Sequence, residues 1–148
     1  MKHNKTILLV EDNPDDEVLT LRALRRHHVA NEIVVTRDGA EALDYLLGTG
    51  TYAARDVTQI PQLILLDLKL PKVDGLEVLR RLRQNLYVRN VPVVVMTTSD
   101  EEQDRIQSYD LHANSFIRKP VDFNEFVEVI RQIGLYWLML NEPPGGGD

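Results

Sequence analysis

Carboxylates follow two apolar segments of the chain, where they could form one site. Glu11 and Asp12 come directly after the aliphatic run 7–10, and Asp67 comes directly after the run 63–66. Carboxylates brought together in this way would raise one another's pKa unless a cation lay among them. The chain contains no cysteine, and hard oxygen ligands favour Mg²⁺, with Mn²⁺ as the alternative.

Hydroxyl groups and an ammonium group end two further apolar segments. Thr97 and Thr98 follow a run of valine and methionine, and Lys119 follows a shorter run that contains Phe116. An aspartate can act as a nucleophile and become an acyl phosphate. Transfer of a phosphoryl group depends mainly on positioning and on neutralising charge, which a metal ion and Lys119 could supply. Each residue alone could belong to a turn, a helix cap or a loop, but together they indicate a site for phosphoryl transfer to an aspartate.

Strands and helices alternate along the sequence in an order that would bring these residues to one edge of a sheet. Apolar or β-branched runs predict five strands, at 7–10, 32–36, 63–66, 93–96 and 115–117. Caps and apolar stripes predict five helices, which begin near residues 14, 39, 75, 100 and 122. This alternation indicates an α/β, doubly wound fold whose parallel sheet is covered on both faces. The functional crevice of such a sheet lies beyond the carboxyl ends of its strands.

The first predicted helix has a well-defined start directly after the acidic pair. Asn13 is its candidate cap and Pro14 its first residue. Asp15, Asp16 and Glu17 place negative charge in its first turn, where the helix dipole favours it. The polar segment 48–62, before the third strand, is predicted to be a surface loop or an extended helix end.

The motifs resemble the receiver domain of two-component response regulators over residues 5–133. The segments that carry the resemblance are Glu11-Asp12, residues 65–71, Asp74-Gly75, residues 95–98 and Lys119-Pro120. The resemblance implies a flavodoxin-like, five-stranded parallel sheet of order 2-1-3-4-5 flanked by five helices. It also implies a phosphoacceptor signalling protein and not an enzyme, apart from self-catalysed phosphorylation and dephosphorylation.

The resemblance assigns roles to the acidic residues. Asp67 is expected to be the phosphoacceptor. Asp12, Asp67 and the backbone carbonyl of Lys69 are expected to bind the metal directly, and Glu11 through water. The side chain of Lys69 adds a positive charge beside the site, which is expected to affect the lifetime of the phosphorylated state.

The resemblance also assigns roles to the residues at the later strand ends. Lys119 is expected to pair with the phosphoryl group, and its bond to Pro120 is expected to be cis. Thr97 is expected to bond a phosphoryl oxygen in the active state, and Phe116 to move with it. Thr98 stands where a smaller residue is frequent, so it is expected to narrow the access of water to the acyl phosphate.

The last predicted helix is more apolar than one domain requires. Its stripe continues past the part that the core can use and consists of Phe126, Ile130, Ile133, Trp137 and Leu140. We expect a receiver domain at 1–141 with an extended last helix, followed by a disordered Pro/Gly tail at 142–148. The apolar extension is expected to form a homodimer; the alternative is that it folds back on its own domain.

The partners follow from charge and from a narrower resemblance. The long loop, residues 109–112 and the aromatic extension are similar to the single-domain receivers that serve bacterial phytochromes, so the expected donor is a sensor histidine kinase such as a phytochrome photoreceptor. The net charge of −6 disfavours a nucleic-acid partner. No apolar run is long enough to span a membrane, and the lack of cysteine suits a cytoplasmic protein.

Other interpretations of the same residues remain open. A Mg²⁺-dependent phosphatase with an aspartyl-phosphate intermediate often carries a second carboxylate two residues after its nucleophile, where this chain has Lys69. A flavodoxin-like cofactor binder would need a phosphate loop after the first strand, where Glu11 and Asp12 would repel phosphate. A pseudo-receiver that serves only as a dimer scaffold would take up no phosphate.

Overall fold

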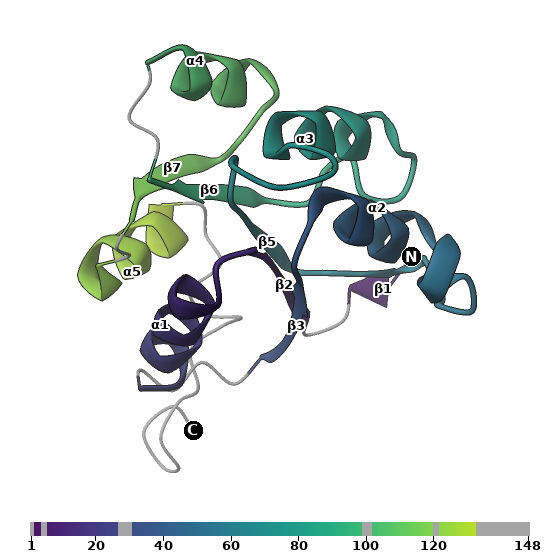
Figure 1. Ribbon diagram of the computed structural model, residues 1–148, viewed down its shortest axis with the longest axis horizontal. Coiled ribbons are helices and arrows are strands. Elements are labelled where there is room, and N and C mark those ends of the chain that lie inside the picture. Colours follow the sequence, from purple (N-terminus) through teal and green to yellow (C-terminus); the bar gives the residue numbers. More distant parts are fainter. Residues whose placement is uncertain (1, 4–5, 27–30, 99–101, 120–121, 133–148) are drawn as a thin grey trace.

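A parallel sheet between two layers of helices forms the centre of the computed structural model, which describes residues 2–3, 6–26, 31–98, 102–119 and 122–132 (Figure 1). The five strands of this sheet lie in the order β3-β2-β5-β6-β7. They are β2 (Thr6–Val10), β3 (Glu32–Thr36), β5 (Leu63–Leu66), β6 (Val93–Thr97) and β7 (Ser115–Arg118). All neighbouring pairs are parallel. When these five strands are numbered 1 to 5 along the chain, their order in the sheet is 2-1-3-4-5, which confirms the prediction.

The helices cover both faces of the sheet (Figure 1). On one face lie α1 (Pro14–Arg26) and α5 (Phe123–Gln132). On the other lie α2 (Gly39–Leu47), α3 (Gly75–Gln84) and α4 (Glu102–Asp110). Because the four crossovers between the strands and the last helix place helices on both faces, the central strands have no solvent side and can be apolar throughout.

The core consists of two clusters separated by the sheet. Every residue of β2, β5 and β6 is buried. Leu8 and Ile64 belong to the cluster beneath α2 and α3, whereas Ile7 and Leu65 belong to the cluster that includes Phe126 of α5. Alternate residues of a strand face opposite sides, and full burial of each such aliphatic side chain contributes roughly 1.5–3 kcal/mol. These clusters fix the strand register, and with it the positions of the residues at the strand ends.

Side-chain caps fix the starts of α1, α2, α3 and α5. The side chains of Asn13, Asp38, Asp74 and Asp122 accept hydrogen bonds from backbone N–H groups two or three residues further on, at 2.7–3.1 Å. The predicted cap at Asn13 is therefore confirmed. Each cap satisfies N–H groups that the helix itself leaves unpaired.

The segment before β5 is a loop that the sequence only partly predicted. It contains a 3₁₀ turn, η1 (Gly50–Tyr52), and the strand β4 (Gln59–Ile60), which pairs in parallel with β1 (Lys2–His3). Two-residue strands are too short to show a periodic pattern, so the sequence did not predict this pair. Arg55 holds the loop: it stacks 4.0 Å from the ring centroid of Tyr45 and donates to the Tyr45 carbonyl.

Three predictions fall on residues outside the described ranges. They are the cis bond to Pro120, the extension of the last helix beyond Gln132 and the disordered tail at 142–148. Among the described residues, none of the helices combines the length and the apolar character needed to cross a bilayer.

Candidate functional site

Two adjacent strands place the acidic residues side by side. Val10 at the end of β2 is in register with Leu66 at the end of β5, so Glu11 and Asp67 leave the sheet next to each other. The N–H of Asp67 donates to the carbonyl of Val10 at 3.1 Å, and the N–H of Glu11 donates to the carbonyl of Thr36 at 2.9 Å. The sheet hydrogen bonds therefore continue one residue past the strands and fix both acidic residues.

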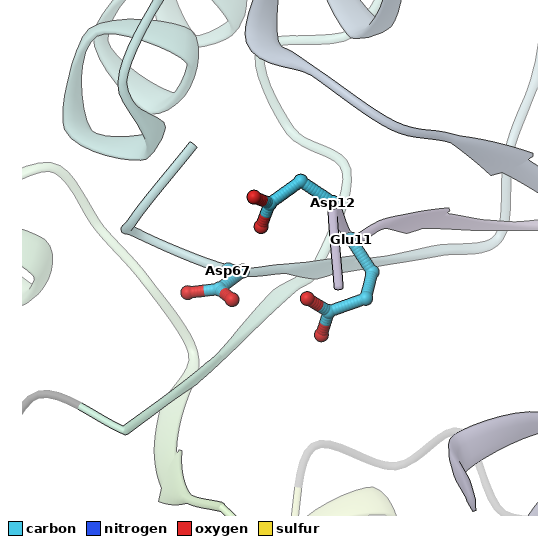
Figure 2. A group of neighbouring side chains, drawn as sticks. All are labelled: Glu11, Asp12 and Asp67. Carbon is cyan, nitrogen blue, oxygen red and sulfur yellow. The ribbon is translucent and has the colours of Figure 1, made fainter. Parts of the chain in front are cut away.

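Figure 2 shows the carboxylates of Glu11, Asp12 and Asp67 grouped at this edge. One oxygen from each lies within 4.8 Å of the others. Glu11 and Asp67 are buried, whereas Asp12 is exposed. Asp12 opens onto a cleft of about 430 Å³ that is also lined by Lys69 and Asp74. A cluster of three carboxylates with one side open to water suits Mg²⁺ or Mn²⁺, because Mg²⁺ keeps several of its waters when it binds to proteins.

Lys119 reaches the carboxylates from the far side of β6. Its backbone N–H donates to the carbonyl of Thr97 at 3.0 Å. Its ammonium lies 2.7 Å from Asp67 Oδ2 and 3.0 Å from Asp16 Oδ2, and it forms an ion pair with Glu11. The side chain is only 5% exposed, so the ammonium exchanges its water shell for three carboxylates.

Burial and neighbouring charges shift the pKa values of Glu11 and Lys119. Burial raises the pKa of Glu11 to about 7; the hydrogen bond and charge of Lys119 oppose the shift, and the charge of Asp67 adds to it. Burial also disfavours the ammonium of Lys119, but its hydrogen bonds to Asp67, Glu11 and Asp16 outweigh burial and raise its pKa above the ordinary value. One ammonium therefore does not satisfy all the carboxylates, and the site favours an additional cation.

The loop after β5 shapes the surroundings of Asp67. The N–H of Lys69 donates to Asp67 Oδ1 at 3.0 Å. The ammonium of Lys69 lies 3.6 Å from Asp104 of α4 and is largely exposed. A Cβ atom at Gly75 would lie 2.3 Å from the carbonyl oxygen of Asp67, so only glycine allows α3 to begin this close to the site.

The remaining predicted residues lie on the two strands beyond β5. Thr97 is the buried last residue of β6, and Thr98 is exposed just after it. Phe116 of β7 is half-buried, packs against the core cluster beneath α2 and α3, and is in register with Val95. The structure thus brings Thr97 to the site edge and places Phe116 on the neighbouring strand; their roles in switching stay predictions.

Within the described part of the chain, Asp16 contacts the site although the sequence did not predict it. Asp16 was explained by the helix dipole alone, but its carboxylate contacts Lys119. The cap at Asn13 could have predicted the position of Asp16. A helix that begins two residues after the acidic pair must have its first turn beside that pair.

Residues 7–131 match the sequence model of the family described as the response regulator receiver domain. The chain belongs to this family. The receiver domain is similar to the bacteriophytochrome response regulator AtBRR, whose solved structure is 54% identical, covers 95% of this chain and 99% of its own, and has a TM-score of 0.82.

Two cyanobacterial relatives carry information about the site. Response regulator Rcp1 from Synechocystis sp. (strain PCC 6803) is 40% identical over 134 residues, which is 90% of this chain and 89% of its own. The structure of Rcp1 in an Mn²⁺-bound form has a TM-score of 0.74. The cyanobacterial phytochrome response regulator RcpA, solved in its phosphorylated form, is 43% identical, covers 91% of this chain and 94% of its own, and has a TM-score of 0.75.

The receiver domain is thus a signalling module that works through phosphorylation and is related to phytochrome response regulators. Receiver domains bind a divalent metal, and Glu11, Asp12 and Asp67 are the residues that could hold it in this chain. The expectations on family, fold and metal are confirmed.

Proposed function

We propose that this receiver domain accepts a phosphoryl group on Asp67 from a sensor histidine kinase and switches its partner contacts in response. The supporting observation is the environment of Asp67. Its Oδ2 lies 2.7 Å from the ammonium of Lys119, its Oδ1 accepts from the N–H of Lys69, and Glu11 and Asp12 lie beside it. A buried carboxylate with a fixed orientation is prepared for in-line attack.

The reaction that we propose forms one bond and breaks one. An oxygen of Asp67 bonds to the phosphorus of a phosphohistidine on the kinase, the phosphorus–nitrogen bond breaks, and the imidazole nitrogen keeps the electron pair and takes up a proton. Lys119 stays beside the phosphoryl oxygens and balances part of their charge. A divalent cation held by Asp12, Asp67, the carbonyl of Lys69 and, through water, Glu11 would neutralise the rest.

The switch that we propose involves the strands β6 and β7. The hydroxyl of Thr97 would turn toward the phosphoryl group, and Phe116 would fill the space that opens behind it. Phe116 is only half-buried, so an inward movement would remove more of its apolar surface from water. The face formed by α4, β7 and α5 would change, and contacts with a partner would change with it.

The mass of the intact protein after incubation with acetyl phosphate tests this function. We expect a gain of one phosphoryl group with Mg²⁺, none with a chelator, and none in Asp67→Asn. Asp74→Asn is the matched control: it removes a carboxylate from the same cleft but keeps a side chain that can cap α3. Labelling of Asp67→Asn would contradict the proposed acceptor. No gain in the wild type, with acetyl phosphate and with a kinase, would favour the pseudo-receiver scaffold.

We also propose that the kinase is a phytochrome. The support is the likeness to AtBRR, a bacteriophytochrome response regulator, and to RcpA, a cyanobacterial phytochrome response regulator. Transfer of labelled phosphate within seconds from a phytochrome histidine kinase, but not from an unrelated histidine kinase at the same concentration, is the expected result. Equal transfer from both kinases would contradict it.

We further propose a homodimer formed by the last helix and its apolar extension. Phe126 and Val129 of α5 are buried in the domain core, and a second copy of the chain would cover the apolar side chains that follow at 133–140. Light scattering over a hundredfold range of concentration should give the mass of two chains for the wild type and of one chain for Trp137→Glu. A single-chain mass for the wild type at every concentration would exclude the dimer.

A further inference from the structure

The ammonium of Lys119 has a third carboxylate partner whose contribution the proposed phosphoryl transfer leaves unexplained. Asp67 is the proposed acceptor, and Glu11 belongs to the acidic group. Asp16, which lies in the first turn of α1, is neither. Its Oδ2 lies 3.0 Å from Lys119 Nζ, and its side chain is 26% exposed, so the contact is closed to most of the solvent.

The start of α1 holds Asp16 in place. Asn13 Oδ1 accepts hydrogen bonds from the backbone N–H groups of both Asp15 and Asp16, at 2.9 Å and 3.1 Å. With the first turn fixed by this cap and by Pro14, the two aspartates point in different directions. Asp15 is exposed, whereas Asp16 turns toward Lys119. The geometry of the cap therefore brings one carboxylate of the first turn to the site and leaves the other in water.

The three partners of Lys119 have different fates during phosphoryl transfer. An ammonium has three N–H donors, and the three carboxylates can use all of them. When Asp67 becomes an acyl phosphate, it loses its carboxylate charge, and the phosphoryl oxygens take its place. Glu11 is also expected to bind the metal through water. Of the three carboxylates, only that of Asp16 has no other role in the proposed steps, so Asp16 can hold the ammonium of Lys119 throughout the transfer.

We propose that Asp16 is a positioning residue that holds the ammonium of Lys119 against Asp67 during phosphoryl transfer. The inference rests on the proposed function of Asp67. It differs from a general effect of acidic charge at the start of α1, because Asp15 carries the same charge in the same turn without touching Lys119. Asp15→Ala and Asp16→Ala form a matched pair that separates the two effects.

The first experiment measures the contact directly. In protein labelled with ¹⁵N, a buried and hydrogen-bonded ammonium exchanges its protons slowly enough to give a side-chain signal, which Lys119→Gln assigns by its loss. We expect the signal of Lys119 in the wild type and in Asp15→Ala, and its broadening or loss in Asp16→Ala. A signal that is absent from the wild type, or unchanged in Asp16→Ala, overturns the inference.

The second experiment measures the initial rate of labelling by acetyl phosphate with Mg²⁺. We expect Asp16→Ala to be slower than the wild type on the order of tenfold, because a displaced ammonium stabilises the transferred group less well. Asp16→Asn should lie between the two, and Asp16→Glu should recover part of the rate through its carboxylate. Asp15→Ala should keep the wild-type rate.

The outcomes of the second experiment separate the two proposals. Equal slowing of Asp15→Ala and Asp16→Ala would show an effect of helix charge alone, and an unchanged rate in Asp16→Ala would show that the contact does not assist transfer. Either result overturns the role of Asp16 while the labelling of Asp67 stands. No labelling of the wild type contradicts the proposed function itself, and the NMR measurement still decides whether Asp16 holds Lys119.

Discussion

Lys119 lies 52 residues after Asp67 in the chain, yet its Nζ approaches Asp67 Oδ2 to 2.7 Å. The strands that carry them, β7 and β5, lie on opposite sides of β6. Neighbouring strands are about 4.8 Å apart, so the two backbones are separated by roughly 10 Å. Only a long side chain can cross that distance, and it must pass the end of β6 at Thr97. The contact therefore depends on the sheet order as much as on the two residues.

Removing this ammonium should slow phosphoryl uptake far more than removing the other lysine beside the site. We expect Lys119→Gln to lower the initial rate of labelling by acetyl phosphate on the order of a hundredfold, because a preorganised charge is lost from the transferred group. Lys69→Gln is the control. Its ammonium faces Asp104 and solvent, so we expect a change of about twofold or less, in line with the small energies of exposed ion pairs. Equal losses in the two variants would show that net charge, and not position, matters.

The stability of the metal-free protein should depend on the protonation of Glu11. Its pKa is raised from 4.5 to about 7 in the folded protein, mainly by burial. Between these values the folded state holds more protons than the unfolded state, so the free energy of unfolding falls as the pH rises from about 5 to 7 and then levels off. Glu11→Gln should remove this loss, which is on the order of 2 kcal/mol.

Urea unfolding in the presence of a chelator, at pH 5, 6, 7 and 8, checks this expectation by comparing Glu11→Gln with the wild type. The difference in the free energy of unfolding should grow in favour of Glu11→Gln up to about pH 7. Addition of Mg²⁺ should stabilise the wild type most at pH 8, because the metal binds the deprotonated carboxylates. Parallel pH profiles in the chelator would mean that Glu11 is ionised at little cost.

The strand ends that carry the site could be predicted from the sequence, because apolar runs that stop at a charged or hydroxyl residue mark buried parallel strands. Glu11, Asp67 and Thr97 all follow directly from this pattern. The order of the strands was predicted from the family resemblance and not from periodicity, because the apolar pattern of a strand does not show which strands lie next to it. The contact between Lys119 and Asp67 depends on that order.

Other contacts were not predictable because they depend on side-chain direction. The sequence shows Asp15 and Asp16 as equivalent acidic residues, and only the geometry of the Asn13 cap distinguishes them. The sequence placed the charge of Lys69 beside the site, but it did not show that the ammonium pairs with Asp104 of α4, which lines the same cleft. The pairing of β1 with β4 depends on two-residue strands, which have no measurable period.

Arg83 should be important for stability although it lies far from the site. Its guanidinium donates to the carbonyl oxygens of four residues at the other end of the sheet, at 2.7–3.0 Å: Arg89, Val91, Leu111 and His112. Arg83→Ala would leave these carbonyls without their donor, so we expect a loss of roughly 2–4 kcal/mol in the free energy of unfolding, measured with urea.

Two further variants test the reason for that loss. Arg81→Ala removes an exposed arginine of the same helix that pairs with Glu77, and it should cost much less. Arg83→Lys keeps the charge but not the planar fork of donors, so it should recover only a small part of the stability. Full recovery with lysine would show that the charge of Arg83 matters more than its hydrogen bonds.

Lys72 should be a site where glycine stabilises the protein. It lies in the loop between β5 and α3 with a φ of 69°, a left-handed conformation that is unfavourable for a residue with a Cβ atom. Its ammonium lies 3.5 Å from Asp38 but is largely exposed, so this ion pair adds little. Lys72→Ala removes the ion pair and keeps the strain, whereas Lys72→Gly removes both. Glycine also loses more entropy on folding. We therefore expect the free energy of unfolding of Lys72→Gly, measured with urea, to be higher than that of Lys72→Ala by only about 0.5–1 kcal/mol. Equal stability of the two variants would show that the loop relaxes around the alanine.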